Sequence, residues 1–178
     1  QNFRNFSFQA GQIGSQDLVN LNATGALVLN GNLSAQGPIT LTGAGISQGG
    51  SSSITADVIT TLAAGSNNIT LNNAGNNFAT VNITSGNVTT LVDSGALILG
   101  TGTTTTLNVT AGGSLTQTGA IVVSGTTTLT AGSNNITLSN ASNNFGTVNI
   151  PSGNVVALAD TGSLVLGDVA AVSLTVNG

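Results

Sequence analysis

The sequence predicts an all-β protein: a right-handed parallel β-helix (β-solenoid) with coils of about 20 residues. Three observations lead to this fold class. Apolar residues make up 39% of the 178 residues, but they occur in runs too short for a membrane-spanning helix. Gly, Asn and Ser separate these runs. The octapeptide AGSNNITL occurs twice, at Ala64–Leu71 and again 67 positions later at Ala131–Leu138.

The repetition extends well beyond this octapeptide. When residues 64–111 are aligned with residues 131–178, 29 of the 48 positions are identical. The N-terminal part matches more loosely, as LNATGALVLN (Leu21–Asn30) does to LVDSGALILG (Leu91–Gly100). We therefore expect a solenoid over residues 18–178, made of about two and a half 67–70-residue units. Residues 1–17 do not match the repeat and are expected to form an N-terminal cap or docking segment.

The short runs have the composition and alternation of strands. V-N-I at 81–83, L-I-L at 97–99 and L-N-V at 107–109 alternate with period two, which is typical of β-strands. The predicted strands of one unit are Ile69–Leu71, Phe78–Ile83, Val88–Val92, Ala96–Leu99, Thr104–Thr110, Ser114–Thr116, Ile121–Val123 and Thr127–Thr130. The Gly- and Asn-rich segments between them are expected to form turns.

A stack of coils explains the duplication better than a β-sandwich does. A sandwich has no need for a 67-residue near-duplicate, whereas each solenoid coil buries its apolar face only against its neighbours. Ile69, Val88 and Leu107 follow one another at a spacing of 19 positions, which suits one coil. The unit then corresponds to three coils with loops or to four tight coils. The spacing alone leaves both counts open.

Asparagines repeat at the predicted corners of the coils. Asn tolerates turn conformations, and stacked Asn side chains can form amide ladders along the axis of a β-stack. The candidates for such a structural Asn ladder are Asn67, Asn68, Asn76, Asn77, Asn134, Asn135, Asn143 and Asn144. Like charges stacked at the same spacing would repel, which agrees with a charged fraction of 3%.

The residue types offer little for catalysis. The chain has no His, Cys, Lys or Glu, so we expect no catalytic site, no metal site, no cofactor and no enzyme activity. Asp93 and Asp160 are equivalent in VDSG and ADTG, and we interpret both as turn aspartates. A net charge of −4 argues against nucleic acid as a partner, and the short apolar runs argue against membrane insertion.

The N-terminal segment QNFRNFSFQA holds the only Arg and three of the five Phe. Phe3, Arg4, Phe6 and Phe8 are therefore candidates for an assembly contact. One hypothesis is a cap over the first coil, and another is a segment that docks onto the next molecule by strand addition. A third is that a fragment of a longer chain begins here.

One long stretch resembles a known family: SLTQTGAIVVSGTTTLTAGSNNITLSNASNNFGTVNIPSGNVVALADTGSLVLG (Ser114–Gly167) is similar to the repeats of filamentous-haemagglutinin-like bacterial adhesins. The similarity covers about residues 20–178. It implies a parallel β-helix, an extracellular location on a bacterial surface, and a role as an adhesin stalk or matrix fibre. The implied partners are flanking repeats or copies of the chain, and host or matrix glycans. The resemblance carries no catalytic residues.

The sequence is also compatible with two functions other than that of an adhesin. In the first, the chain is a self-assembling filament subunit joined through its Phe-rich N-terminal segment. In the second, the Thr runs Thr101–Thr106 and Gly125–Thr130 form an ice-binding face. Residues Thr104–Thr106 become Ala171–Ser173 in the next unit, which we expect to interrupt such a face.

Overall fold

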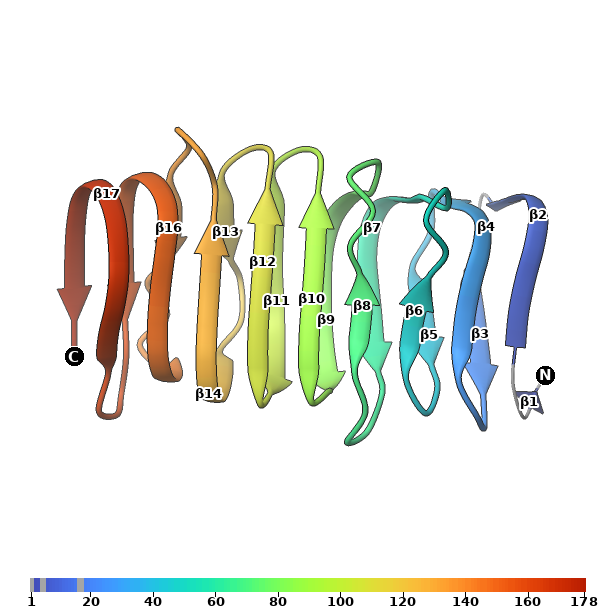
Figure 1. Cartoon of the computed structure of the whole chain (residues 1–178), viewed down its shortest axis with the longest axis horizontal. Coiled ribbons are helices and arrows are strands. Elements are labelled where there is room, and N and C mark those ends of the chain that lie inside the picture. Colours follow the sequence, from blue (N-terminus) through green and yellow to red (C-terminus); the bar gives the residue numbers. More distant parts are fainter. Residues whose placement is uncertain (1, 4–5, 16–17) are drawn as a thin grey trace.

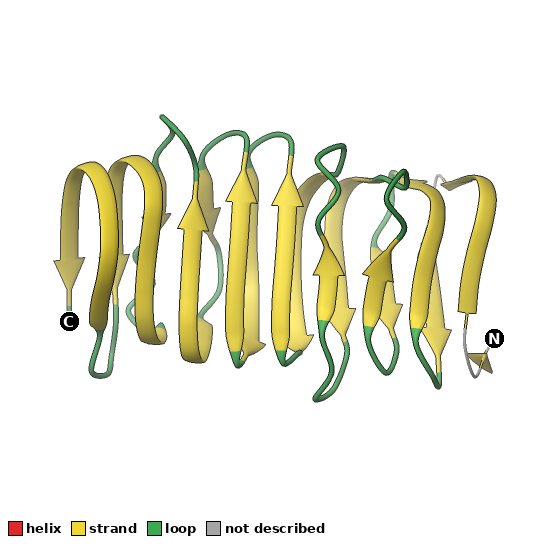
Figure 2. Ribbon diagram, viewed as in Figure 1, coloured by secondary structure: helices red, strands yellow, loops and turns green. Residues whose placement is uncertain are grey.

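The computed structural model describes residues 2–3, 6–15 and 18–178, with side-chain surroundings from residue 18 onward. The described residues form strands and loops without a helix, and hence no helix that could span a membrane (Figure 2). The strands are β1 (Asn2–Phe3), β2 (Phe6–Ser15), β3 (Val19–Ala23), β4 (Leu27–Ala35), β5 (Ile39–Thr42), β6 (Ile46–Gln48), β7 (Ile54–Ala63), β8 (Ile69–Leu71), β9 (Asn77–Ser85), β10 (Val88–Asp93), β11 (Leu97–Thr104), β12 (Thr106–Ala111), β13 (Leu115–Gln117), β14 (Ile121–Thr130), β15 (Ile136–Leu138), β16 (Asn144–Ala159) and β17 (Val165–Asn177).

The strands wind into a parallel β-solenoid. Each strand pairs in parallel with strands one coil away along the chain, as β3 does with β5 and β8 with β10. In Figure 1 the nearer strands β8, β10 and β12 run upward and the fainter β9 and β11 run downward, while the chain advances from right to left. This sense of rotation is right-handed. The predicted fold class is confirmed.

The core consists of inward-pointing residues stacked in columns. One column on the nearer wall passes through Leu27, Ile46, Ile69, Thr89, Leu107, Thr127, Val148 and Leu166. A column on the far wall passes through Leu97, Leu115, Ile136, Val156 and Leu174. Between β3 and β16, buried residues largely alternate with more exposed ones along the strands, so the two walls enclose one continuous apolar interior.

One predicted landmark is shifted by a residue. Thr89, not Val88, pairs with both Ile69 and Leu107 and points into the core. The Thr89 hydroxyl lies 3.0 Å from the hydroxyl of Thr104, so a hydrogen bond satisfies this buried polar group. The 19-residue spacing of Ile69, Val88 and Leu107 therefore predicted the coil length correctly but the inward residue of β10 wrongly.

The 67-residue unit is not a whole number of coils. From Ile69 the nearer-wall column reaches Thr127 after three coils and Val148 after four. Ile136, the repeat equivalent of Ile69, falls between them in sequence and lies on the far wall, paired with Leu115 and Val156. Each unit therefore makes about three and a half coils. Both predicted counts, three and four, are wrong, and equivalent segments alternate between the two walls.

The N-terminal strands continue the solenoid. β1 pairs with β3, and β2 pairs with β4, in parallel and about one coil apart. The predicted boundary at residue 17 is therefore not a change of backbone fold in the described residues. Arg4 and the side chains of Phe3, Phe6 and Phe8 lie outside what the structure describes, so their predicted assembly contact stays a prediction.

Candidate functional site

The duplicated AGSNN segments form equivalent tight turns. Gly65 and Gly132 have φ values of 59° and 56°, in the left-handed region that favours glycine. Within each turn a backbone N–H donates to the carbonyl three residues earlier, from Asn67 to Ala64 and again in the second copy. Each turn brings the chain from one wall to the other. The repeated segment thus has a conformational role.

A hydrogen-bonded pair of side-chain amides, Gln48 and Asn76, lies at the next corner of the first unit. The Asn76 side chain is fully buried and exchanges two hydrogen bonds with the Gln48 amide, of 2.7 and 2.9 Å. Asn76 Oδ1 also accepts from the N–H of Ile54 at 2.9 Å. Its Nδ2 lies 3.2 Å from the carbonyl of Leu71 and 3.3 Å from that of Val92. Because these partners lie on successive coils, the Asn76 side chain links neighbouring coils by hydrogen bonds.

The second unit reproduces this arrangement on the opposite wall. Asn143 is fully buried and exchanges hydrogen bonds of 2.8 and 2.9 Å with Gln117. It accepts from Ile121 N–H at 2.9 Å, and it donates to the carbonyls of Leu138 and Ala159 at 3.0 and 3.2 Å. The near-duplicate sequence therefore preserves a complete hydrogen-bonded corner.

A buried carboxylate completes each corner. Asp93 Oδ2 accepts from Gly95 N–H at 2.9 Å, which confirms the predicted turn aspartate. Its Oδ1 accepts from Phe78 N–H on the preceding coil at 2.6 Å, and Asp160 makes the same bond to Phe145 at 2.6 Å. Burial raises the pKa of Asp93 above its ordinary value, against the lowering effect of the two N–H donors. Each carboxylate links two coils.

The eight predicted Asn residues do not form one ladder. Asn68 Oδ1 accepts from Asn87 Nδ2 at 3.3 Å, and Asn135 Oδ1 accepts from Asn154 Nδ2 at 3.1 Å, as single rungs between adjacent coils. Asn67 and Asn134 instead donate to backbone carbonyls, and Asn76 and Asn143 pair with glutamines. The remaining two, Asn77 and Asn144, lie exposed in β9 and β16. A continuous ladder is wrong because each unit makes about three and a half coils. This half-coil offset places equivalent Asn residues of the two units on opposite walls.

The corner clusters offer no open reactive group. Asp93 and Asp160 are separated by three and a half coils, about 17 Å along the axis at the usual strand spacing, so the two carboxylates cannot share a proton. The residues the structure describes include no group of three or more metal-binding side chains.

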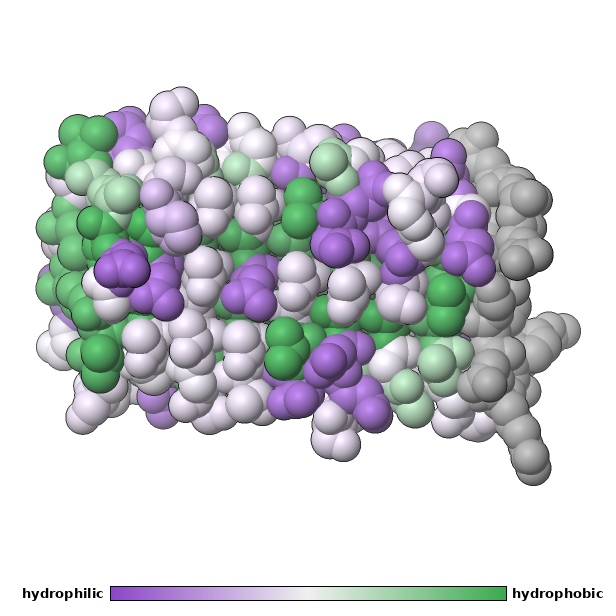
Figure 3. Space-filling model, in the orientation of Figure 1, coloured by the Kyte–Doolittle hydropathy of each residue, from purple (hydrophilic) through white to green (hydrophobic). Residues whose placement is uncertain are grey.

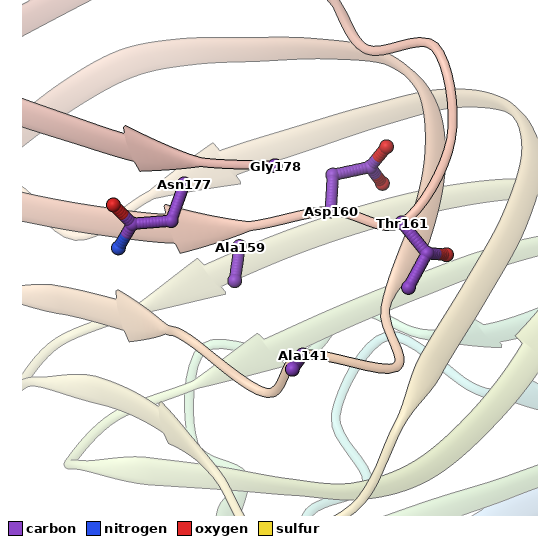
Figure 4. A pocket seen from close by; sticks show the side chains of 6 residues that line it. All are labelled: Ala141, Ala159, Asp160, Thr161, Asn177 and Gly178. Carbon is purple, nitrogen blue, oxygen red and sulfur yellow. The ribbon is translucent and has the colours of Figure 1, made fainter.

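A shallow depression of about 250 Å³ lies over the Asp160 corner (Figure 4). Its lining is Ala141, Ala159, Asp160, Thr161, Asn177 and Gly178. Both Asp160 oxygens accept backbone N–H groups, and the Thr161 hydroxyl donates to the Asn143 carbonyl. In the first unit the N–H of Gly112, on the following coil, donates to the carbonyl of Asp93. The depression at Asp160 therefore corresponds to the space that the following coil fills at the Asp93 corner of the first unit.

Sequence reasoning missed the glutamines and two core threonines. Gln48 and Gln117 stand in ISQGG and LTQTG, whose match was visible as part of the repeat. Thr60 and Thr127, which are equivalent positions of the repeat, are fully buried with hydroxyls that have no hydrogen-bond partner. The period-two pattern around Thr60 and Thr127 predicts a strand. It does not indicate that a Thr, in place of a Val, occupies an inward position.

The outward surface of the nearer wall carries an aligned polar column. Ser47, Thr70, Thr90, Asn108, Thr128 and Asn149 occupy matching positions on successive coils. Each is partly exposed. Ala171–Ser173, which we expected to interrupt a Thr face, pair instead with residues 153–155 of β16. They therefore do not follow Thr104–Thr106 on the same face, and that sequence objection is wrong.

Comparison with known proteins places this repeat in a family. Neither the curated proteins nor the solved structures include a match to the chain. A family described as repeats of unknown function (DUF5649) matches residues 15–85 and again residues 85–151, together more than half of the sequence. The two matches are consecutive and meet in β9, in agreement with the repeat seen in the sequence. The chain belongs to this family of DUF5649 repeats.

Proposed function

We propose that this chain is a structural and adhesive module of an extracellular bacterial adhesin or matrix fibre, a rigid rod without catalytic activity. The observation that carries the proposal is the unbroken stack of coils. Apolar columns run through it, and the buried corner groups Asn76, Asn143, Asp93 and Asp160 all bond to the protein itself. Such a stack resists bending and lengthens in proportion to the number of coils.

The surface chemistry supports the adhesive part of the proposal. Described side chains of the lateral faces are chiefly Thr, Ser and Asn, which present hydroxyl and amide groups in rows about 4.8 Å apart. Each group contributes little, but a regular row can bind a repeating neutral polymer such as a glycan at many points. The resemblance of Ser114–Gly167 to haemagglutinin-like adhesins favours the same location and role.

Inserting one further 67-residue unit, a copy of residues 64–130 placed before residue 131, tests the rod. The insertion should lengthen the particle by about 17 Å, measured by electron microscopy or small-angle scattering. Beads coated with the natural chain and with the extended chain should both be retained on immobilised matrix glycans, the extended chain more strongly. An unchanged length would contradict the rod, and retention no greater than that of albumin-coated beads would contradict adhesion.

Ice binding is a second candidate, because one observation favours it. The column through Thr70, Thr90, Asn108 and Thr128 is in register over consecutive coils, as a lattice-matching surface requires. Val88 and Val92 flank Thr90 on the outward side of β10 and interrupt the neighbouring columns. Thermal hysteresis at micromolar protein concentration, abolished by Thr90→Lys, would establish ice binding. Its absence in the natural chain would exclude this function.

A further inference from the structure

The sequence contains nine Asn-x-Ser/Thr triplets, the pattern of an acceptor for N-linked sugars. An acceptor triplet must enter the active site of a transferase, so it normally lies on an exposed loop. Eight of the triplets lie beyond residue 17, where the structure describes their surroundings. They begin at Asn22, Asn32, Asn68, Asn82, Asn87, Asn108, Asn135 and Asn140.

Seven of these eight triplets overlap a strand of the solenoid and include a buried residue. In the triplet that begins at Asn87, the third residue is Thr89, which is buried and hydrogen-bonded to Thr104. A transferase could bind such a triplet only if a buried side chain left the core. In the other six, the buried residue is the second of the triplet: Ala23, Leu33, Ile69, Ile83, Val109 and Ile136.

The triplet Asn140-Ala141-Ser142 lies wholly in the loop between β15 and β16, on which Figure 4 shows Ala141. Ala141 and Ser142 are exposed and Asn140 is partly exposed. The Ser142 N–H donates to Asn140 Oδ1 at 2.9 Å, and the Asn140 N–H donates to Gln117 Oε1 at 3.1 Å, so the loop has a defined conformation. Among the residues that the structure describes, none is hydrogen-bonded to Asn140 Nδ2 or to the Ser142 hydroxyl. Both groups are therefore available to an enzyme.

The equivalent loop of the first unit shows that this exposure is a property of the loop. Residues 73–75 have the same exposure as residues 140–142, although several further coils follow the first unit. Figure 3 shows hydrophilic residues over the end of β8, where this loop begins in Figure 1. The Gly75 N–H donates to Asn73 Oδ1 at 2.8 Å, as in the second unit. The first loop, however, has Gly75 in place of a serine, and its Asn73 Nδ2 donates to the Gly50 carbonyl at 2.9 Å.

We propose that Asn140 is an acceptor site for an N-linked sugar in the folded protein. Asn140 Nδ2 attacks the anomeric carbon of a glycosyl diphosphate, and a C–N bond forms while the bond from that carbon to the diphosphate oxygen breaks. The diphosphate leaves with the electron pair, and Nδ2 gives one proton to a base of the transferase. This inference goes beyond the proposed adhesive role and is independent of it, because it concerns one loop and not the rod.

Incubation of the folded chain with a soluble asparagine glucosyltransferase and UDP-glucose, followed by mass spectrometry, tests the site. We expect one added hexose per chain, on the peptide that contains Asn140. Synthetic peptides that span the triplets at Asn68, Asn135 and Asn140 should all be modified, because outside the fold no core restrains them. A folded chain that stays unmodified while its Asn140 peptide is modified would overturn the proposal. So would a folded chain modified equally at Asn68 or Asn135.

Two variants of Ser142 provide matched controls. Ser142→Gly reproduces the residue of the first unit and should lose the hexose, whereas Ser142→Thr keeps a hydroxyl and should retain it. Far-UV circular dichroism of both variants establishes that the solenoid is retained. Equal modification of the two variants would contradict the role of the hydroxyl and with it the site.

The chain isolated from the cells that produce it should carry the sugar on Asn140. Its mass identifies the donor, since hexose increments indicate a nucleotide-activated sugar and a single oligosaccharide indicates a lipid-linked one. An unmodified Asn140 in that chain would overturn the proposal and would leave the proposed adhesive role unaffected.

Discussion

The two near-identical units have the same residues in different surroundings. Leu99, Leu107 and Val109 of the first unit are 0% or 1% exposed, whereas Leu166, Leu174 and Val176 of the second are 37% to 42% exposed. The residue types and the strands are the same, but the first unit is followed by another coil. Burial in this fold is therefore supplied by the neighbouring coil and not by a segment's own sequence.

The corners of the two units, by contrast, differ little. Asn76 and Asn143 make the same set of hydrogen bonds, and Phe78 and Phe145 are both 1% exposed. These corners lie on opposite walls, yet their geometry is the same because the preceding and the following coil supply equivalent partners in both units, including Asp93 for Phe78 and Asp160 for Phe145. The comparison separates residues whose following coil is present in both units from residues whose following coil is present in the first unit alone.

Truncating the equivalent leucines of the two units should give the largest difference in the free energy of unfolding. Leu107→Ala removes a side chain enclosed by coils on both sides and should lower the free energy of unfolding by about 2 to 5 kcal/mol. Leu174→Ala removes the equivalent side chain from the open face and should cost about 1 kcal/mol or less. Guanidinium unfolding followed by circular dichroism measures both. Equal losses would contradict the role of the neighbouring coil.

Removing a corner amide should affect both units alike. Asn76→Ala and Asn143→Ala each remove two hydrogen bonds from a half-buried glutamine and the side-chain acceptor of a buried backbone N–H, and each should cost about 2 to 4 kcal/mol. Asn77→Ala is the control, because Asn77 is exposed beside Asn76 and its loss should change stability by less than about 0.5 kcal/mol. A clear difference between the two corner variants would show that the corners are not equivalent.

Replacing the unpaired core hydroxyls should stabilise the protein. Thr60→Val and Thr127→Val exchange a buried hydroxyl without a partner for a methyl group of similar size. Each should raise the free energy of unfolding by about 1 kcal/mol. Thr89→Val serves as the control, since it breaks the hydrogen bond to Thr104 and should not stabilise. If all three variants behave alike in thermal unfolding, the assignment of the unpaired hydroxyls is wrong.

The pH dependence contributed by Asp93 should be the smallest effect. Burial raises its pKa in the folded protein above the ordinary value of 3.8, so the folded state binds a proton more readily than the unfolded chain. The stability that this group contributes is fully present below pH 3.8 and is lost as the pH rises through the folded pKa. The melting-temperature difference between the natural chain and Asp93→Asn should therefore favour the natural chain more at pH 3 than at pH 7. The reverse trend would contradict the direction of the shift.

Much of the fold could be predicted from the sequence, because inward and outward positions differ in residue type. Alternation predicted the strands, and the 19-residue spacing predicted the coil. The turn aspartates followed from the position of Asp93 and Asp160 before a short glycine-containing segment. These features depend on local chemistry, which a single sequence displays directly.

The half-coil offset between the units could not be predicted, because a segment needs the same pattern of residues whichever wall it joins. A strand such as Ile69–Leu71 needs inward apolar residues and outward polar ones whichever wall it joins. Its equivalent Ile136–Leu138 therefore fits the far wall with an unchanged sequence. The Gln48–Asn76 and Gln117–Asn143 pairs were missed for a related reason: their partners are 28 and 26 residues apart, and only the coil path brings them together.

Disulfide mapping tests the half-coil offset most directly, since the chain has no cysteine of its own. Double-cysteine variants at Thr70/Thr90, Asn108/Thr128 and Thr128/Asn149 join outward neighbours of the nearer wall, and Thr116/Thr137 joins neighbours of the far wall. Paired residues on adjacent strands are close enough for a disulfide, so all four variants should oxidise without loss of the fold. If Thr70/Thr90 forms but Asn108/Thr128 and Thr128/Asn149 do not, Thr128 lies on the other wall and the unit is a whole number of coils.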